Sequence, residues 1–125
     1  MDLRDDLFQS FGELLYVIFN QDNGISDHQF QGIRQTLQQV SWGEEVYWSF
    51  QYEAQHHPEP EKLFYQVLDA FSQFGPQETY APFFTLILHL IHQSESSDLK
   101  EQRLKKFERF RFLIMERFQN DQNIK

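Results

Sequence analysis

Apolar residues recur every three or four positions along almost the whole 125-residue chain, and this spacing constrains the fold more than any other feature. Such spacing places side chains on one face of an α-helix, whereas a half-buried strand would need strict alternation. The pattern predicts an all-α fold, a compact bundle of about six helices forming a single domain over residues 1–125. The expected helices cover residues 3–19, 26–40, 42–56, 60–74, 82–91 and 98–118.

The fifth expected helix differs from the others because it is apolar on nearly every side between Phe83 and Ile91. A helix without a polar face is typical of a protein interior. We therefore expect this helix to lie in the middle of the bundle, surrounded by some of the 14 phenylalanines of the chain.

Cysteine is absent from the chain, which excludes disulfides, thiolate nucleophiles and cysteine-based zinc sites. The N-terminus is acidic between Met1 and Asp6 and leads directly into a helical pattern, so no signal peptide is expected. No apolar run approaches the length that a membrane-spanning helix needs, so no integral membrane segment is predicted. Together these features predict a cytoplasmic protein.

The net charge of −8 is unevenly distributed along the chain. Residues 1–99 carry 15 acidic and three basic residues, whereas residues 100–125 carry eight basic and four acidic residues. An acidic body repels nucleic acid and anionic lipid, so neither is the expected partner. The basic end is expected to be a solvated face or to complement the acidic body, with nucleic-acid or membrane contact as the alternative. That contact would use Lys100, Arg103, Lys105, Lys106, Arg109 and Arg111.

A weak internal similarity appears when the chain is shifted by 73 residues. An apolar helix, an acidic residue in the turn and an amphipathic helix then align with a second copy of the same layout. This alignment indicates a pseudo-repeat, although helical periodicity alone also aligns some apolar positions. The aligned pairs are Phe11 with Phe84, Leu14 with Ile87, Leu15 with Leu88, Ile18 with Ile91, Asp22 with Glu95, and Gln29 with Gln102.

Residues 22–30 carry the motif Asp-Asn-Gly-Ile-Ser-Asp-His-Gln-Phe and follow the apolar segment 14–19. This motif resembles the Asp-Gly-x-Ile-Ser-x-x-Glu-Leu signature of TerB-like domains, the tellurite-resistance family that includes the N-terminal domain of a DnaJ-type membrane co-chaperone. Residues 94–104 resemble a second, more divergent copy. The resemblance implies a bacterial protein with an all-helical fold of pseudo-repeated halves over nearly the whole chain.

The chain departs from the family pattern at positions that the resemblance associates with divalent metal binding. Asn23 stands where the family has Gly, Gln29 where it has Glu, and Glu95 where it has Asp. A neutral Gln is a poor ligand for a hard cation because it offers one carbonyl oxygen and no charge. We therefore predict no metal and no other cofactor, with a divalent-metal sensor as the alternative. The ligands of such a sensor would be Asp22, Asp27, Glu95 and Asp98.

Three short motifs match or approximate a helix-capping box, in which a side chain accepts a hydrogen bond from the first turn. Capping accounts for these residues without any ligand. The motifs are Ser26-x-x-Gln29, Ser41-x-x-Glu44 and Asp98-x-x-Glu101.

Residues that could carry chemistry are few. His89, His92 and Glu95 share one helix face and could approach one metal, but His89 is expected to be a hydrogen-bonded core residue and His92 a helix-end residue. No serine lies in a nucleophile motif, and the five glycines form no phosphate-binding loop. We therefore do not expect an enzyme and assign no catalytic, cofactor-binding or metal residues.

Five aromatic residues crowd the third expected helix, more than one helix face can bury. Either this helix is covered on two faces, or some of its rings form a partner-binding surface. The expected function is therefore a non-catalytic protein-interaction or scaffold domain with an unknown protein partner. A homodimer through the last helix is expected if that helix exposes Phe112 or Leu113. The crowded residues are Trp42, Tyr47, Trp48, Phe50 and Tyr52.

Overall fold

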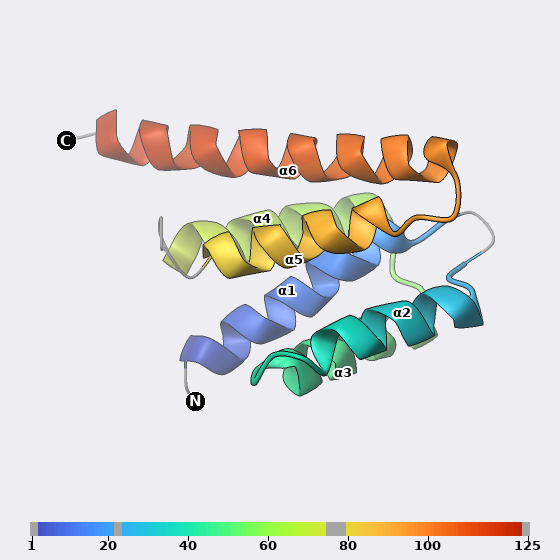
Figure 1. Cartoon of the computed structure of the whole chain (residues 1–125). Helices are drawn as coiled ribbons and strands as arrows, with labels where there is room; N and C mark the ends of the chain where they lie inside the picture. The colour runs from blue at the N-terminus through green and yellow to red at the C-terminus, as the bar shows by residue number, and fades with distance from the viewer. Residues whose placement is uncertain (1–2, 22–23, 75–79, 124–125) are drawn as a thin grey trace. The chain divides into compact units, whose positions relative to one another are not determined.

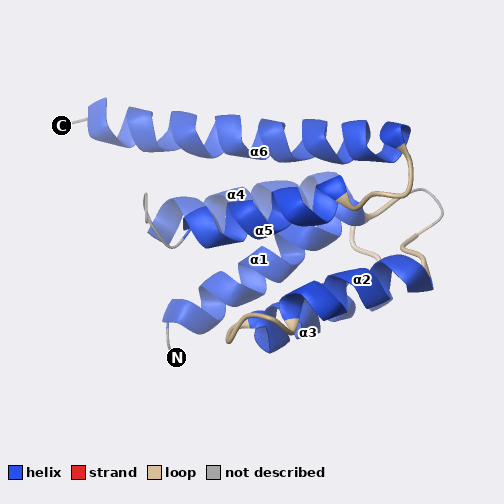
Figure 2. Cartoon of the chain, in the orientation of Figure 1, coloured by secondary structure: helices blue, strands red, loops and turns tan. Residues whose placement is uncertain are grey.

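The computed structural model describes the backbone of residues 3–21, 24–74 and 80–123. Within these ranges the chain is all-α, without strands, and the expected fold class is confirmed (Figures 1 and 2). The helices are α1 (Leu3–Phe19), α2 (Asp27–Leu37), α3 (Gly43–His56), α4 (Pro60–Phe74), α5 (Tyr80–His92) and α6 (Ser97–Asn123). In the described residues, no helix is both long enough and apolar enough to cross a membrane.

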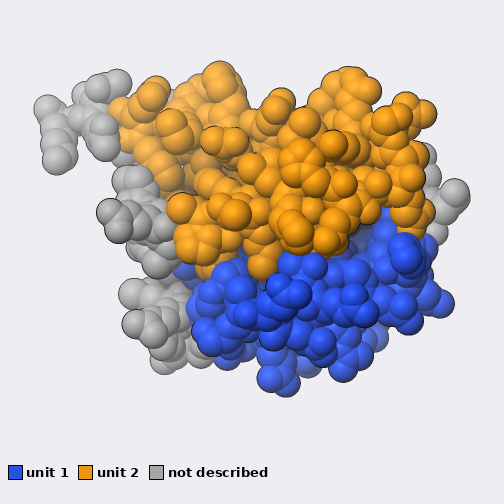
Figure 3. Space-filling model, in the orientation of Figure 1, with its two compact units in different colours: residues 1–67 blue, residues 68–125 orange. Residues whose placement is uncertain are grey.

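The chain divides into two compact units, residues 1–67 and residues 68–125, which we call unit 1 and unit 2 (Figure 3). Unit 1 contains α1, α2, α3 and the first half of α4, and unit 2 contains the rest of α4 with α5 and α6. Unit 1 carries 11 acidic and three basic residues, whereas unit 2 carries eight of each. Unit 1 therefore carries the whole net charge of −8, and unit 2 has no net charge.

Unit 1 is organised by a close crossing of α1 and α3. A Cβ atom built on Gly12 would lie 2.5 Å from the backbone oxygen of Val46 and 2.6 Å from the Cβ of Ser49. The Ser49 hydroxyl donates a hydrogen bond of 2.7 Å to the Gln9 carbonyl across the same crossing. The two helices approach this closely because Gly12 has no side chain.

The helix that is buried on nearly all sides is α1, not α5. Every residue from Leu14 to Phe19 is at most 5% exposed. In α5, by contrast, Thr85 and His89 are exposed, although Ile87 and Ile91 are fully buried. The expectation that α5 lacks an exposed face is therefore wrong, because a threonine and two histidines on one side suffice to form one.

The turn between α2 and α3 depends on Gly43, where an added Cβ would lie 1.7 Å from the Leu37 carbonyl oxygen. This tight turn leaves α3 without a side-chain cap at its first residue, so the predicted Ser41 cap is wrong. The predicted Ser26 cap is confirmed, since its hydroxyl accepts a 3.2 Å bond from the Gln29 backbone N–H. The Gln29 side-chain oxygen, however, is buried without a hydrogen-bond partner, so the reciprocal half of the capping box is not formed.

Unit 2 is organised by aromatic rings. Phe71 of α4 stacks on Tyr80 of α5 at a centroid distance of 5.0 Å and meets Phe110 of α6 edge-on at 5.3 Å. The buried Tyr80 hydroxyl donates a 2.7 Å hydrogen bond to the Phe71 carbonyl. That carbonyl belongs to the last turn of α4, so the bond ties the first turn of α5 to the end of α4.

The turn from α5 to α6 corrects two further expectations. The hydroxyl of Ser96, not the Asp98 side chain, accepts from the Leu99 backbone N–H and caps α6. Arg103, expected on the exposed basic face, is only 3% exposed. It reaches back along the chain and donates a 2.8 Å bond to the Ser94 hydroxyl, so it stabilises the turn.

The shift of 73 residues relates the helix ends as well as the sequence. It places the last residue of α1, Phe19, on His92, the last residue of α5. The aligned pairs Leu14 with Ile87 and Ile18 with Ile91 are all buried. These correspondences agree with the pseudo-repeat, which stays a prediction.

Candidate functional site

An exposed aromatic row runs along α3. Glu44, Trp48, Tyr52 and His56 follow one another at four-residue spacing, so they share one face of the helix. Trp48 is 67% exposed and Tyr52 is 45% exposed. Their rings stack at 5.9 Å, and the Tyr52 ring stacks on His56 at 3.9 Å. This row presents a continuous, pre-ordered π surface to solvent.

The other aromatic residues of this segment face the interior or its edge. Phe50 is fully buried and contacts Phe30 of α2 at 5.3 Å. Trp42 is half-buried and stacks on Phe8 of α1 at 5.8 Å. Helix α3 is therefore covered where it meets α1 and α2 and exposes rings on its other side, and a partner-binding surface there stays a prediction.

A cavity of about 620 Å³ adjoins the exposed row. Tyr47 and Trp48 form part of its wall, and the Arg34 guanidinium lies 5.6 Å from the centre of the Tyr47 ring. Glu44 contributes a carboxylate to the same wall. The cavity therefore offers aromatic faces together with one positive and one negative group.

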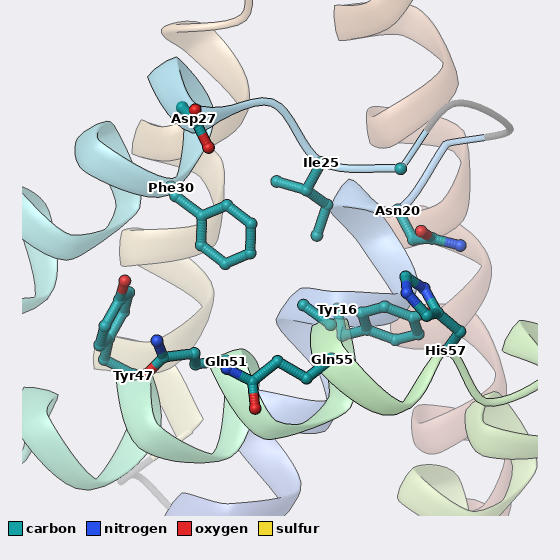
Figure 4. A pocket seen from close by; sticks show the side chains of 11 residues that line it. Tyr16, Asn20, Ile25, Asp27, Phe30, Tyr47, Gln51, Gln55 and His57 are labelled. Carbon is teal, nitrogen blue, oxygen red and sulfur yellow. The ribbon is translucent and has the colours of Figure 1, made fainter.

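A second cavity, of about 560 Å³, shares Tyr47 and Gln51 with the first, and all its lining residues belong to unit 1. Figure 4 shows the Ile25 and Phe30 side chains facing α3 across this cavity. Gln51 and Gln55 lie on the α3 side. The cavity has an apolar centre and an amide rim, which suits a mixed apolar and polar side chain better than a small ion.

Tyr16 and His57 lie together at one end of the second cavity (Figure 4). The Tyr16 hydroxyl donates a 3.4 Å bond to the Pro58 carbonyl, and burial, aided by Glu53, raises its pKa. His57 follows the last residue of α3 in a left-handed conformation, with φ 51° and ψ 52°. A raised pKa keeps the phenol protonated, so Tyr16 acts here as a hydrogen-bond donor that holds the loop.

Sequence reasoning did not single out Gln51 and Gln55. They continue the four-residue spacing from Tyr47, one row beside the exposed aromatic row. The sequence shows this spacing, but it does not show that α2 and the loop at Ile25 lie opposite these residues and form a cavity with them. Polar residues in such a row are otherwise typical of a solvated helix face.

The residues of the metal alternative belong to different parts of the chain. Asp22 lies outside the described residues, Asp27 begins α2 in unit 1, and the exposed Glu95 and Asp98 belong to unit 2. Where side chains are described, no group of three or more His, Asp or Glu residues could hold a metal ion.

His89 is exposed, so its expected place in the core is wrong. Its Nε2 lies 3.0 Å from the Gln93 side-chain nitrogen, a contact within the last turn of α5 and the turn that follows.

The basic segment of α6 is partly engaged within the helix. Lys105 pairs with Glu101 at 3.4 Å, and Arg111 lies over the Phe107 ring at 5.6 Å. Phe112 is 67% exposed, which meets the condition under which a homodimer through this helix is expected.

Comparisons with protein-family models, curated proteins and solved structures find no match to this chain.

Proposed function

We propose that this chain is a non-catalytic protein-interaction domain that binds a basic, partly apolar segment of a partner protein on α3. The observation that carries the proposal is the exposure of Trp48, stacked on Tyr52 beside a cavity of about 620 Å³. Trp and Tyr are enriched among the residues that dominate binding energies at protein interfaces. An ordered stack loses little side-chain entropy when a partner binds.

The charge of unit 1 favours a cationic partner. Its excess of eight acidic over basic residues attracts lysine and arginine side chains and repels acidic segments. The faces of Trp48 and Tyr52 attract the same cations through cation–π contacts. Glu44, one turn before Trp48, supplies a carboxylate at the end of the row.

The cavities favour a partner with apolar anchors. Leu37 and Val40 line the first cavity, and Ile25 and Phe30 line the second. An amphipathic segment could therefore place apolar side chains in the cavities and its cations against the exposed row.

Binding of a labelled peptide tests this proposal. A helical peptide of lysine and leucine, with a fluorescent label, is titrated with the protein and followed by anisotropy. We expect saturable binding with a Kd of about 10–100 µM, which is typical of a single small groove. The substitution Trp48→Ala should weaken binding about tenfold or more, because it removes the central ring of the row.

Two controls make the test specific. A peptide with glutamate in place of lysine should not bind, since unit 1 would repel it. Phe112→Ala removes a ring that is as exposed as Trp48 but lies on α6, and it should leave binding unchanged. The proposal is wrong if both peptides bind equally well, or if Trp48→Ala binds like the wild type.

On the resemblance to TerB-like domains alone, we further propose a bacterial setting for this interaction, and the absence of cysteine supports a cytoplasmic one. Residues 24–30 of the motif contribute Gly24, Ile25, Asp27 and Phe30 to the second cavity. In this chain the motif therefore supports a binding surface for a side chain.

A further inference from the structure

The second cavity, of about 560 Å³, is lined mainly by side chains of three kinds. Among the described residues, no lysine or arginine lines it, since Arg34, which lies over the Tyr47 ring, lines only the first cavity. The lining therefore carries one carboxylate and, with His57 neutral, no positive charge. The apolar and aromatic side chains are Tyr16, Ile25, Phe30, Tyr47 and Ala54, the carboxamides are Asn20, Gln51 and Gln55, and the carboxylate is Asp27.

Two aromatic rings of this cavity are held in place by a third ring. Phe50 is fully buried, and its ring centre lies 5.3 Å from that of Phe30 on α2 and 6.3 Å from that of Tyr47 on α3. Phe30 and Tyr47 are themselves half-buried, so each keeps part of its surface for the cavity. Rings fixed in this way lose little freedom when a planar group packs against them.

A carboxylate lies next to one of these rings. Asp27 and Phe30 are three residues apart on α2, so they share one face of the helix, and both line the cavity. Asp27 is exposed and can therefore meet a partner. A cation that packs on the Phe30 ring is consequently within reach of a carboxylate on the same helix face.

The α3 side of the cavity offers hydrogen-bond acceptors. Gln51 and Gln55 are exposed, and they lie on the side opposite Ile25 and Phe30 (Figure 4). They are one helical turn apart, which places their Cβ atoms about 5–6 Å from each other. Each carboxamide oxygen can accept hydrogen bonds, and a planar group with N–H donors on several edges can bridge two acceptors at this spacing.

We propose that the second cavity binds an arginine side chain of the partner, a pairing that rests on the proposed binding of a basic segment to α3. The methylene groups of the arginine would pack on Ile25, and its guanidinium would stack on Phe30. Its N–H groups would donate to the carboxamide oxygens of α3, and Asp27 would supply the opposite charge.

Other side chains fit this lining less well. A lysine ammonium is a compact point charge, so it can neither stack on a ring as a plane nor bridge two carboxamides in a fixed geometry. An acidic side chain would meet Asp27 and the net negative charge of unit 1. A purely apolar side chain would cover the carboxamides without giving them hydrogen bonds, which is unfavourable.

Two labelled peptides test the proposal. One is the helical peptide of lysine and leucine, and the other has arginine at every lysine position. The peptides have the same charge, so the net charge of unit 1 attracts them equally. We expect the arginine peptide to bind about tenfold more tightly in anisotropy titrations, because only a guanidinium can make the contacts described. The measured quantity is the Kd of the lysine peptide divided by that of the arginine peptide, which we call the arginine preference.

Two substitutions in the cavity should lower the arginine preference to about threefold or less. Asp27→Asn removes the carboxylate, and Gln55→Leu removes a carboxamide that lines only the second cavity. Both residues are exposed, so far-UV circular dichroism should be unchanged. The matched control is Glu45→Gln, which removes one negative charge from unit 1 as Asp27→Asn does. Glu45 lines neither cavity, so this variant should keep the tenfold preference.

This proposal and the proposed function fail in different ways. An arginine preference near one in the wild type, or one that Asp27→Asn and Gln55→Leu leave unchanged, would overturn the arginine cavity and leave peptide binding intact. Trp48→Ala should instead weaken both peptides and keep the preference.

If neither peptide binds, the proposed function is wrong, and a small probe then decides on the cavity alone. N-acetylarginine amide should shift the side-chain amide signals of Gln51 and Gln55 in NMR spectra. N-acetyllysine amide at the same concentration should shift them less, and equal shifts would overturn the arginine cavity.

Discussion

In unit 1 the two principal helices lie close together because a side chain is absent, whereas in unit 2 large rings fill the space between helices. Gly12 lets α1 meet α3 at van der Waals distance, and Phe71, Tyr80 and Phe110 form the corresponding contact in unit 2. A close crossing has no room for an added atom, but a cluster of rings can rearrange. The two units should therefore respond differently to small changes in volume.

The two units also differ in the ionisable groups that they bury. Unit 1 half-buries the Glu13 carboxyl near Glu53, and unit 2 buries the Arg103 guanidinium against the Ser94 hydroxyl. Burial raises the pKa of Glu13 to about 7, so it takes up a proton near neutral pH. Burial also lowers the pKa of Arg103, but an arginine keeps its charge at all ordinary pH values. The Glu13 carboxyl should therefore make the stability of unit 1 depend on pH near neutrality.

The largest effect on the free energy of unfolding is expected for Gly12→Ala. Its Cβ would overlap the Val46 backbone oxygen and the Ser49 side chain, so α1 and α3 must separate. We expect a loss of about 3 kcal/mol in the free energy of unfolding, measured by urea titration. Both tryptophans, Trp42 and Trp48, lie in unit 1, so their fluorescence reports its unfolding.

The control for this substitution is Gly32→Ala, in the interior of α2, where an added Cβ meets nothing within 4 Å. It should stabilise the chain by about 0.5–1 kcal/mol, since alanine favours a helix. Equal effects of the two substitutions would show that the α1–α3 crossing is not close.

A smaller effect is expected for Glu13→Gln, and it should depend on pH. The folded chain holds a proton on Glu13 between the usual pKa of 4.5 and the raised pKa of about 7. The stability that this proton provides is present below about pH 4.5 and is lost as the pH rises through about 7. At pH 8 we expect the variant to be more stable than the wild type, because the wild type must then keep an ionised carboxylate half-buried. The expected difference is on the order of 2 kcal/mol, which is less than the full pKa shift implies because solvent partly screens Glu13.

Urea titrations at several pH values, followed by tryptophan fluorescence, check this prediction. At pH 4 the two proteins should have nearly equal stability, because the carboxyl is mostly protonated in both the folded and the unfolded chain. A wild type whose stability rises between pH 5 and 8 relative to Glu13→Gln would contradict it.

The smallest effect is expected for Tyr80→Phe, which removes the hydroxyl that donates to the Phe71 carbonyl but keeps the stacked ring. We expect a loss of about 1 kcal/mol, measured by far-UV circular dichroism during urea unfolding. The matched change Tyr52→Phe, on an exposed ring, should alter stability by less than about 0.5 kcal/mol. If both changes are neutral, the carbonyl of Phe71 does not depend on the hydroxyl.

Apolar spacing predicted the number of helices and most of their boundaries, because a helical period depends on residues that are close in sequence. It could not predict which helix is surrounded, since α1 and α5 both carry wide apolar faces. What covers each helix is decided by residues far away in the sequence. Gly12 and Ser49 are 37 positions apart, and neither stands out before α1 and α3 are paired.

The candidate site was predicted only in part, because the residues that cover each ring of α3 lie far away in the sequence. The aromatic excess in residues 42–52 indicated an exposed surface, but the sequence did not say which rings would be exposed. Arg103 was misplaced because charge alone suggested solvent, whereas its Ser94 partner depends on the path of the turn.

The left-handed backbone at His57 limits how the protein can be redesigned. A residue with a Cβ atom pays about 1–2 kcal/mol in this conformation, and glycine would avoid most of that penalty. An engineer seeking heat resistance would replace His57 first, and would thereby delete a ring from the end of the cavity beside Tyr16. Variants selected only for thermal stability should therefore acquire glycine at position 57 and bind less well at this cavity. Selection for binding should keep the strained residue.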